Sequence, residues 1–304
     1  MKLGTRGSAL ALWQANWVKA ELEKAHSGLT VDLILIKTTG DKILDVPLAK
    51  IGGKGLFTKE IDEALLDGRI DLAVHSLKDV PFQLPEGITL AAVPKREDHR
   101  DAFLSNGPRL RELKPDATIG TSSLRRQLQL KHLIPSLNIA MLRGNVDTRL
   151  KRLANGEFDA IILAAAGLKR LGHADRITEI LEDDVMLSAV GQGALGIVCR
   201  VSDVSAHATL AALEDRDSRI CVTAERALLR ALGGSCQVPV AGHAVVDGDR
   251  VRLKGLIASL DGDKVLRAES VTAMNEAERL GLSLGEQLIA AGGAEILAEI
   301  ARNA

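Results

Sequence analysis

The stretch Ala73-Val74-His75-Ser76-Leu77-Lys78-Asp79-Val80-Pro81 indicates the fold class, because a buried strand ends within it and polar side chains follow at once. Strand ends in an open α/β sheet border a crevice where ligands bind, so the four polar side chains predict a binding site at this edge. An ordinary solvated turn closed by the proline explains the same stretch equally well. The flanking segments therefore have to distinguish the two interpretations.

The composition is typical of a soluble globular protein. The chain has 304 residues, of which 46% are hydrophobic and 26% charged, enough for two or three domains with separate cores and too apolar for disorder. The longest apolar run, Ala160 to Leu168, is too short to cross a bilayer. Only the residues from Ala9 to Trp13 form an apolar run near the N-terminus, which does not resemble a signal peptide. We therefore expect a cytoplasmic protein without a membrane partner.

Charge and cysteine content exclude several classes of function. The 39 Lys and Arg residues nearly balance the 40 Asp and Glu residues, so no net field recruits nucleic acid, although local clusters can still bind anions. The aromatic residues, two Trp and four Phe, are too few and too scattered to stack bases. Cys199, Cys221 and Cys236 lack a CxxC spacing, which argues against a disulfide framework or a zinc site. One of them can be a reactive thiol.

The N-terminal segment predicts an anion site beside a helix start. Lys2 to Arg6 has the pattern of a short strand, and Ser8 then begins a helix with one apolar face. Arg6 and Ser8 thus flank free helical N–H groups and the positive end of the helix dipole, where anions bind. The β-branched run Val31 to Lys37 predicts a further strand, central in a parallel sheet.

The segment Thr38 to Phe57 has no clear periodicity. It contains Lys50 and the run Gly52-Gly53-Lys54-Gly55. A segment of this length without regular structure is usually a lid or disordered. Glycines with lysines suit phosphate or carboxylate binding, but the spacing is not that of a nucleotide P-loop. We predict a mobile, anion-binding lid over residues 38–57, with Lys50 and Lys54 as ligand-binding residues.

An internal echo indicates that one supersecondary unit is used twice. Asp67-Gly68-Arg69-Ile70-Asp71 is matched 88 residues later by Asn155-Gly156-Glu157-Phe158-Asp159, and each precedes a buried strand. Two βαβ domains that face each other across a cleft are the architecture of two-lobed anion-binding proteins. A chance match stays open, because the preceding helical segments align poorly.

The second copy carries a concentrated set of arginines. Thr118 to Gly120 predicts a strand end, and Thr121-Ser122-Ser123-Leu124-Arg125-Arg126 predicts a helix start with hydroxyl caps. Arg143-Gly144-Asn145 follows the next strand, with Asn145 as the cap and Arg149 one turn into the helix; Arg170 follows a third strand. A single arginine at a helix start is usually incidental, but repetition after successive strands indicates a carboxylate-rich or phosphate-rich ligand.

The C-terminal third predicts a different architecture. The strand Ala194 to Arg200 and the helix after it can return the chain to the first domain, whereas alternating strands joined at Asp247-Gly248 and Asp261-Gly262 predict a small α+β domain. Two helices, near Asn275 to Ala291 and Ala294 to Ala301, would cover one face of its sheet. A lone cysteine is most often a buried hydrophobe, but the glycine-rich loop around Cys236 favours an accessible thiol.

A series of motifs spans almost the whole chain. They are Thr5-Arg6-Gly7-Ser8 with Ala11-Leu12-Trp13-Gln14, Gly52 to Phe57, Val74 to Pro81, Gly120 to Arg126, Leu142 to Asn145 with Thr148-Arg149-Leu150, Ala165 to Arg170, Gly191-Gln192-Gly193-Ala194, and the Cys236 loop. In this order they resemble the porphobilinogen deaminases, also called hydroxymethylbilane synthases. Ser235 is inserted into the Gly-Gly-Cys core of the family loop, and Gly7 stands where the family often has glutamine. Neither departure touches a charged or nucleophilic position.

The resemblance implies three domains. The first two would be similar to type II periplasmic binding proteins, with the active site in the cleft between them, and the third is the small α+β domain. We expect domain 1 over residues 1–95 and 194–212, domain 2 over 99–189 and domain 3 over 216–304.

The resemblance also implies a transferase of tetrapyrrole (heme, chlorophyll and cobalamin) biosynthesis. Four porphobilinogens would be joined head to tail, with loss of ammonia, to a covalent dipyrromethane cofactor held as a thioether by Cys236, and water would then release hydroxymethylbilane; no metal is needed. The essential carboxylate of the family matches Asp79. The residues expected to hold the carboxylates of cofactor and substrate are Arg6, Ser8, Gln14, Lys50, Lys54, Ser76, Lys78, Thr121, Ser123, Arg125, Arg126, Arg143, Asn145, Arg149 and Arg170.

This chemistry agrees with the residue pattern. Each pyrrole ring brings an acetate and a propionate, so a growing chain needs many arginine and lysine donors. The alternative function is a non-catalytic, two-lobed binding protein for a small anion, in which the third domain binds a partner. The absence of a secretion signal weakens that alternative, and we expect a monomer.

Overall fold

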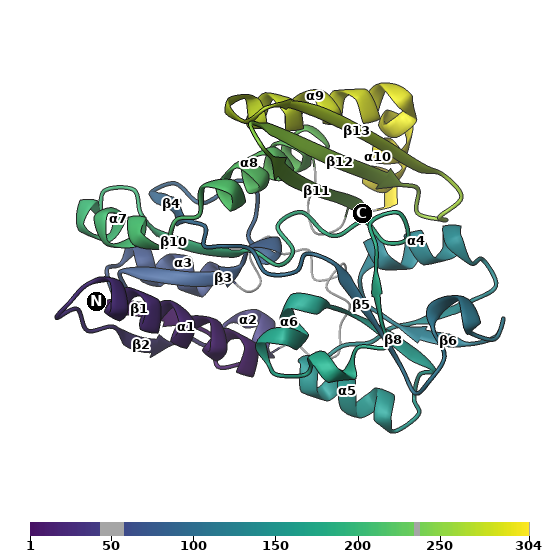
Figure 1. The fold of residues 1–304 in the computed structure, drawn as a ribbon, viewed down its shortest axis with the longest axis horizontal. Coiled ribbons are helices and arrows are strands. Elements are labelled where there is room, and N and C mark those ends of the chain that lie inside the picture. Colours follow the sequence, from purple (N-terminus) through teal and green to yellow (C-terminus); the bar gives the residue numbers. More distant parts are fainter. Residues whose placement is uncertain (43–57, 234–237, 304) are drawn as a thin grey trace. The chain divides into compact units, whose positions relative to one another are not determined.

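The computed structural model describes residues 1–42, 58–233 and 238–303. They form two compact units, one of Met1–Glu97 with Gly193–Arg219 and one of Asp98–Gln192 with Ile220–Ala304 (Figure 1). In the described ranges, each unit has a five-stranded sheet between helices, and the second unit adds a three-stranded sheet. The predicted fold class, two α/β sheets with a small α+β C-terminal part, is therefore confirmed. None of the helices in the described part of the chain combines the length and apolar character that a membrane crossing requires.

The sheet of the first unit is mixed. Its strands are β1 (Lys2–Thr5), β2 (Asp32–Leu35), β3 (Leu72–Ser76), β4 (Ile88–Ala92) and β10 (Leu195–Arg200), in the order β2-β1-β3-β10-β4. β1 runs parallel to β2 and β3, whereas β10 is antiparallel to β3 and β4. The chain thus returns to the first unit through β10, as predicted.

Helices cover both faces of this sheet because its strands alternate between two apolar sets. Leu72 and Val74 of β3 pack on the side of α1 (Ala9–Ala25) and α7 (Val204–Leu210). Ala73, which points the other way, packs with α3 (Lys59–Leu66). The unit is therefore a three-layer α/β sandwich with two hydrophobic cores.

The prediction of a central strand over Val31 to Lys37 is wrong. β2 is an edge strand that pairs with β1 alone in the sheet order, and the side chain of Leu35 is 63% exposed. β-branched apolar composition shows that a segment is extended and partly covered, but it does not determine how many neighbours the strand has.

The second five-stranded sheet repeats the arrangement of the first. Its strands are β5 (Asp101–Ser105), β6 (Thr118–Gly120), β7 (Asn138–Ala140), β8 (Ala160–Ala164) and β9 (Glu179–Leu181), in the order β7-β6-β8-β5-β9. β6 is parallel to β7 and β8, and β5 is antiparallel to β8 and β9. α5 (Val146–Ala154) and α6 (Ala165–Arg170) cover one face and α4 (Leu124–Leu133) the other.

The internal echo is confirmed as a structural repeat. Gly68 and Gly156 end α3 and α5 with φ of 73° and 74°, the left-handed region that favours glycine. The carboxylate of Asp71 accepts a hydrogen bond from the N–H of Lys2 at 2.7 Å, and Asp159 accepts the equivalent bond from Thr118 at 2.7 Å. Each aspartate thus ties the start of the third strand to the start of the first.

The three-stranded sheet belongs to the second unit. It consists of β11 (Val240–Asp247), β12 (Arg250–Ala258) and β13 (Val265–Ala273), antiparallel and joined at the predicted glycine turns, with Gly248 and Gly262 at φ of 61° and 85°. The helices are α8 (Arg216–Ala231), α9 (Ala277–Leu288) and α10 (Ala294–Asn303), and α9 lies along the sheet (Figure 1). All three contribute to the core on this face, whereas Leu128 of α4 packs against Ala241 and Leu256 on the opposite face.

The remaining elements are short. Helix α2 (Thr39–Lys42) forms the start of the predicted lid, whose residues 43–57 lie outside the described ranges. The single turns are η2 (Leu77–Asp79), η3 (Leu110–Glu112), η4 (Ala174–Arg176), η5 (Ala211–Leu213), η6 (Met274–Glu276) and the π-helical turn η7 (Ile289–Gly293).

Helices α8 and α9 approach closely because glycines of α9 face small residues of α8. A Cβ atom at Gly281 would lie 2.1 Å from the carbonyl oxygen of Ala224, and one at Gly285 would lie 2.4 Å from Cβ of Ala231. No side chain can occupy that space while the backbones keep their separation.

We predict that Gly281→Ala lowers the free energy of unfolding of the second unit by about 1–3 kcal/mol, since the added methyl meets a backbone oxygen that cannot rotate away. Urea unfolding followed by circular dichroism measures the change. The exposed Ser283, on the same helix, supplies the control Ser283→Ala, for which we expect a change within about 0.5 kcal/mol. Equal stability of the two variants would contradict the close packing of α8 on α9.

Candidate active site

In the first unit, the predicted site residues gather at one edge of the sheet. β1 and β3 are parallel neighbours, so Arg6 and the turn Leu77–Asp79 follow strand ends at the same edge. The side-chain amide of Gln14 donates a hydrogen bond to Oγ of Ser76 at 2.8 Å, which joins α1 to the end of β3. Ser8 caps α1, because its Oγ accepts from the N–H of Ala11 at 3.4 Å. The hydrogen bond from Gln14 places the N-terminal half of α1 beside the stretch Ala73–Pro81.

The side chains of that stretch divide into buried and accessible ones. His75 is buried, and burial together with the positive charge of Arg6 lowers its pKa to about 4. The imidazole is therefore neutral near pH 7. Lys78 is partly exposed, and Asp79 is exposed at the end of the short turn. Among the polar residues of Ala73–Pro81, His75 therefore belongs to the interior, whereas the side chain of Asp79 is accessible to a ligand.

In the second unit, the predicted residues again follow parallel strands. Thr121 follows β6, Arg143 follows β7 after a short loop, and Arg170 ends the helix that follows β8. Asn145 caps α5 as predicted, since its Oδ1 accepts from the N–H of Thr148 at 2.8 Å. Nε of Arg149 donates to the carbonyl oxygen of Gly144 at 2.8 Å, which ties the loop after β7 to α5.

The hydroxyl capping of α4 differs from the prediction. Ser123 occupies the cap position but its side chain makes no capping hydrogen bond. The buried Thr121 instead accepts from the N–H of Ser123 at 3.2 Å. The hydroxyl of Thr121 therefore fixes the entry to the helix.

The paired arginines of α4 are buried against one carboxylate, that of Asp101. Nη2 of Arg125 lies 2.8 Å from Oδ2 of Asp101 and Nη2 of Arg126 lies 2.7 Å from Oδ1, with Nε of Arg126 at 3.0 Å from the same atom. Arg125 also donates to the carbonyl oxygen of Leu187 at 2.6 Å, and Arg126 to that of Ile162 at 2.9 Å. The exposed fractions are 7% for Arg125, 5% for Arg126 and 0% for Asp101.

This cluster carries a net positive charge inside the second unit. In the described part of the chain, both guanidinium groups pair with Asp101, so two positive charges share one negative charge. Burial alone would raise the pKa of Asp101, but the charges of Arg125 and Arg126 lower it to about 2. Burial lowers the pKa of Arg125, Asp101 raises it and Arg126 lowers it further. A buried excess positive charge is costly unless an anion joins it, so the cluster is suited to bind a ligand carboxylate.

Two residues that complete this network were not predicted as site residues. Gln192 is fully buried, and its Nε2 donates to Oδ1 of Asp101 at 3.0 Å and to the carbonyl oxygen of His99 at 2.7 Å. Asp101 itself is the other. The signal that could have identified Asp101 is its place at the first position of an apolar strand. A carboxylate buried there needs a cation as its partner.

Two of the three cysteines lie in the described part of the chain. Cys236, Lys50 and Lys54 lie outside the described residues. Cys199 and Cys221 are buried, and burial together with Asp203 raises the pKa of the Cys199 thiol to about 11. Cys199 is therefore protonated at neutral pH and a poor nucleophile.

We predict that Asp101→Asn destabilises the second unit by about 3–5 kcal/mol, because two buried guanidinium groups lose their counter-charge. The pKa of Asp101 is lower in the folded chain than in the unfolded one, so its contribution is present above about pH 4 and is lost as the pH falls toward 2. Thermal melts between pH 2 and neutrality measure this, with the exposed Asp175 changed to Asn as the control. If both variants melted alike at neutral pH, the buried ion pairs would not stabilise the fold.

Solved structures similar to the chain share little sequence identity with it. One is the periplasmic VFT2 domain of BvgS from Bordetella pertussis, with 13% identity, a TM-score of 0.40 and coverage of 70% of this chain and 86% of that one. Another is a probable amino-acid ABC transporter extracellular-binding protein, ytmK, from Bacillus subtilis, with 9% identity, a TM-score of 0.41 and coverage of 69% and 88%.

Sequence relatives are much closer. Residues 1–208 match the family described as porphobilinogen deaminase, dipyromethane cofactor binding domain, and residues 219–290 match porphobilinogen deaminase, C-terminal domain. The porphobilinogen deaminase of Geobacter sulfurreducens is 54% identical over 99% of this chain and 94% of its own length. That of Nitratidesulfovibrio vulgaris is 55% identical over 98% and 96%. The chain therefore belongs to the porphobilinogen deaminase family.

Proposed function

We propose that this transferase joins four porphobilinogens head to tail on a dipyrromethane primer, and that the arginines of the second unit hold the carboxylates of the primer and the growing chain. The observation that supports this most directly is the buried cluster of Arg125, Arg126 and Asp101, in which two guanidinium groups share one carboxylate among the described residues. Every pyrrole ring of the product carries two carboxylates. A ligand carboxylate at Arg125 would neutralise the cluster.

The residues present fit such a cofactor. In the described part of the chain Arg125 has two partners, Asp101 and the carbonyl of Leu187, for the five N–H groups of its guanidinium. Thr121 and Ser123 lie at the start of the same helix, whose N–H groups favour an anion. Bound to the chain, the cofactor supplies a pyrrole terminus to which substrate units are added. Its attachment through Cys236 makes each addition effectively intramolecular.

Asp79 is the residue to which we assign charge stabilisation. Departure of ammonia from porphobilinogen leaves a positive charge on the substrate, and a fixed carboxylate beside the substrate stabilises such a charge. Asp79 is the exposed acidic side chain of the turn after β3, with Lys78 and Ser76 beside it in the chain. The ammonium of Lys78 and the hydroxyl of Ser76 suit the substrate carboxylates, which leaves Asp79 for the developing positive charge.

The alternative, a non-catalytic binding protein for small anions, would use the same arginines. It gives no role to Cys236 in the sequence Gly233-Gly234-Ser235-Cys236, since reversible anion binding needs no nucleophile. Relatives that match over nearly the whole chain are named as the enzyme, which also favours the transferase.

We predict that the purified protein exceeds its sequence mass by two porphobilinogens less two ammonias, and that Cys236→Ser abolishes this increment. A serine hydroxyl is a far weaker nucleophile than a thiolate at neutral pH. Intact-mass spectrometry measures the increment, and the buried Cys221 supplies the control Cys221→Ser, which should keep it. Loss of the increment in Cys221→Ser alone would refute the choice of cysteine, and its absence from the wild-type enzyme would favour the binding protein.

We predict that Asp79→Asn slows turnover by roughly 10²–10³-fold while the mass increment and the melting temperature stay those of the wild type, because one transition-state charge interaction is lost. The rate is measured by the absorbance of the oxidised product. The exposed Glu86, in the same unit, supplies the control Glu86→Gln, which should leave the rate unchanged. A rate near that of the wild type in Asp79→Asn would mean that another group stabilises the charge.

A further inference from the structure

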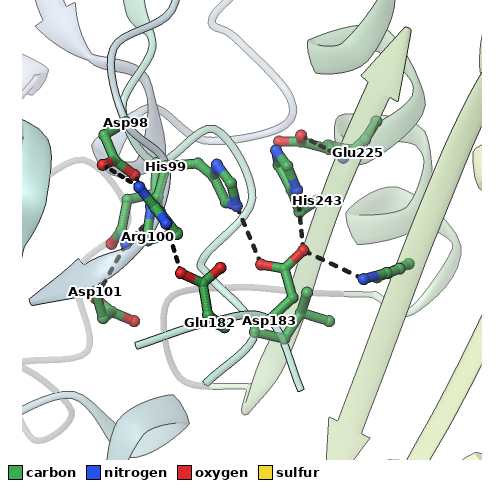
Figure 2. Close-up of polar contacts among 12 residues, drawn as sticks. Asp98, His99, Arg100, Asp101, Glu182, Asp183, Glu225 and His243 are labelled. Carbon is green, nitrogen blue, oxygen red and sulfur yellow. Dashed lines mark hydrogen bonds and ion pairs between the residues drawn. The ribbon is translucent and has the colours of Figure 1, made fainter. Parts of the chain in front are cut away.

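Three residues far apart in the sequence converge in the second unit. The carboxylate of Asp183 lies between two histidines, with Oδ1 at 3.0 Å from Nε2 of His99 and Oδ2 at 3.4 Å from Nδ1 of His243 (Figure 2). The two imidazole rings stack with centroids 3.3 Å apart and planes 8° apart. One possible metal-ligating atom from each residue lies within 4.8 Å of the others. The exposed fractions of the side chains are 22%, 17% and 7% for His99, Asp183 and His243.

The sheets explain why these residues meet. In the antiparallel pair β5–β9, Asp101 is opposite Leu181, the last pair of the two strands. Continuing the same register by two residues along each chain brings His99 opposite Asp183. His243 lies on β11, on the same face as Ala241, which packs with Leu128 of α4. The α/β part of the unit thus supplies His99 and Asp183, and the three-stranded sheet supplies His243.

The chemistry of these groups is that of a transition-metal site. Two imidazole nitrogens and one carboxylate are a common ligand set for Zn²⁺, with a water at the fourth position. Ligand atoms around a tetrahedral ion with bonds of about 2.0–2.1 Å lie about 3.4 Å apart. The three possible ligand atoms here lie within 4.8 Å of one another, so small side-chain movements suffice to reach that spacing. Burial would raise the pKa of Asp183, but hydrogen bonds from His243 and His99 hold it far below its usual range, so the carboxylate is ionised.

We propose that His99, Asp183 and His243 form a binding site for a divalent ion that prefers imidazole ligands, such as Zn²⁺, and that the ion links the three-stranded sheet to the α/β part of the second unit. This role is structural, and the ion takes no part in the chemical steps of the transferase reaction. The link continues inward, since the backbone carbonyl of His99 and the carboxylate of Asp101 accept from the same amide group, that of Gln192. An ion at His99 would therefore also steady the buried arginine cluster.

Ion binding requires two local changes. An imidazole nitrogen directs its lone pair within the ring plane, and two parallel rings cannot both direct a lone pair at one ion, so the histidines must rotate out of their stack. Nζ of Lys254 lies 3.5 Å from Oδ2 of Asp183 and competes for the carboxylate. The Lys254 side chain is 41% exposed and can turn toward solvent. The ion thus takes the place of a lysine charge and of the protons on the two facing nitrogens.

The test is isothermal titration of the full-length enzyme, with its cofactor attached, with Zn²⁺ in a buffer that does not chelate metals. We expect one equivalent of Zn²⁺ per wild-type chain and a raised melting temperature. His99→Gln and His243→Gln should each weaken binding by at least about tenfold and abolish the rise in melting temperature. Lys254→Gln should tighten binding, because it removes the competing cation. Co²⁺ in place of Zn²⁺ should give the visible bands of a four-coordinate ion.

A matched control is available in the same unit. Nε2 of His173 lies 3.2 Å from Oδ1 of Asp147, a histidine–aspartate pair to which the described residues add no third ligand. His173→Gln should leave Zn²⁺ binding unchanged. Equal Zn²⁺ uptake by the wild type, His99→Gln and His243→Gln would overturn the proposal, as would a thiolate charge-transfer band with Co²⁺, which would place the ion on a cysteine. If His243→Gln failed to fold, His99→Gln, at the more exposed position, would decide the question alone.

Discussion

The carboxylate of Asp101 holds together the buried arginine cluster of the second unit. It is fully buried, it pairs with Arg125 and Arg126, and it starts the strand β5 that joins β8 to β9 in the second sheet. A single guanidinium at this depth would be expensive to desolvate, and a pair of them without a counter-charge would repel each other. The aspartate therefore allows two arginines to exist inside the fold in fixed orientations. Any function of α4 in binding anions depends on this ion pair.

The repeated sheet order explains why cations collect at particular places. In both units the first three strands of the βαβ pattern run parallel, and residues that follow parallel strands emerge at one edge. Arg6 and Lys78 use that edge in the first unit, and Thr121 and Arg143 use it in the second. The helix starts that follow β1 and β6 add N–H groups at the same edge. One strand order, used twice, thus produces two polar edges with different side chains.

The sequence predicted what depends on local pattern and missed what depends on long-range pairing. The repeat at Gly68 and Gly156, the cap at Asn145 and the strands of the C-terminal sheet follow from short-range signals, and the structure confirms them. The edge position of β2 does not follow from short-range signals, because the order of strands depends on how all of them pair in the sheet. Asp101, the partner of Arg125 and Arg126, lies more than twenty residues away in the sequence. His99, Asp183 and His243 follow no spacing motif. Their proximity is visible only from the register of β5 with β9 and from the face of β11 that carries His243.

Charge balance gives a reason for the composition of the arginine cluster. Two aspartates would neutralise Arg125 and Arg126 and make a more stable interior, but such a site would have nothing to offer a carboxylate. Without any internal carboxylate, the two arginines would be too costly to bury when no ligand is bound. One aspartate is the intermediate case, in which the fold tolerates the cluster and a ligand carboxylate still improves its energy. Gln192, which donates to Asp101 without adding charge, orients that carboxylate and preserves the excess. In the function proposed above, affinity for an anion would then depend on the positive charge that Asp101 leaves unbalanced among the described residues.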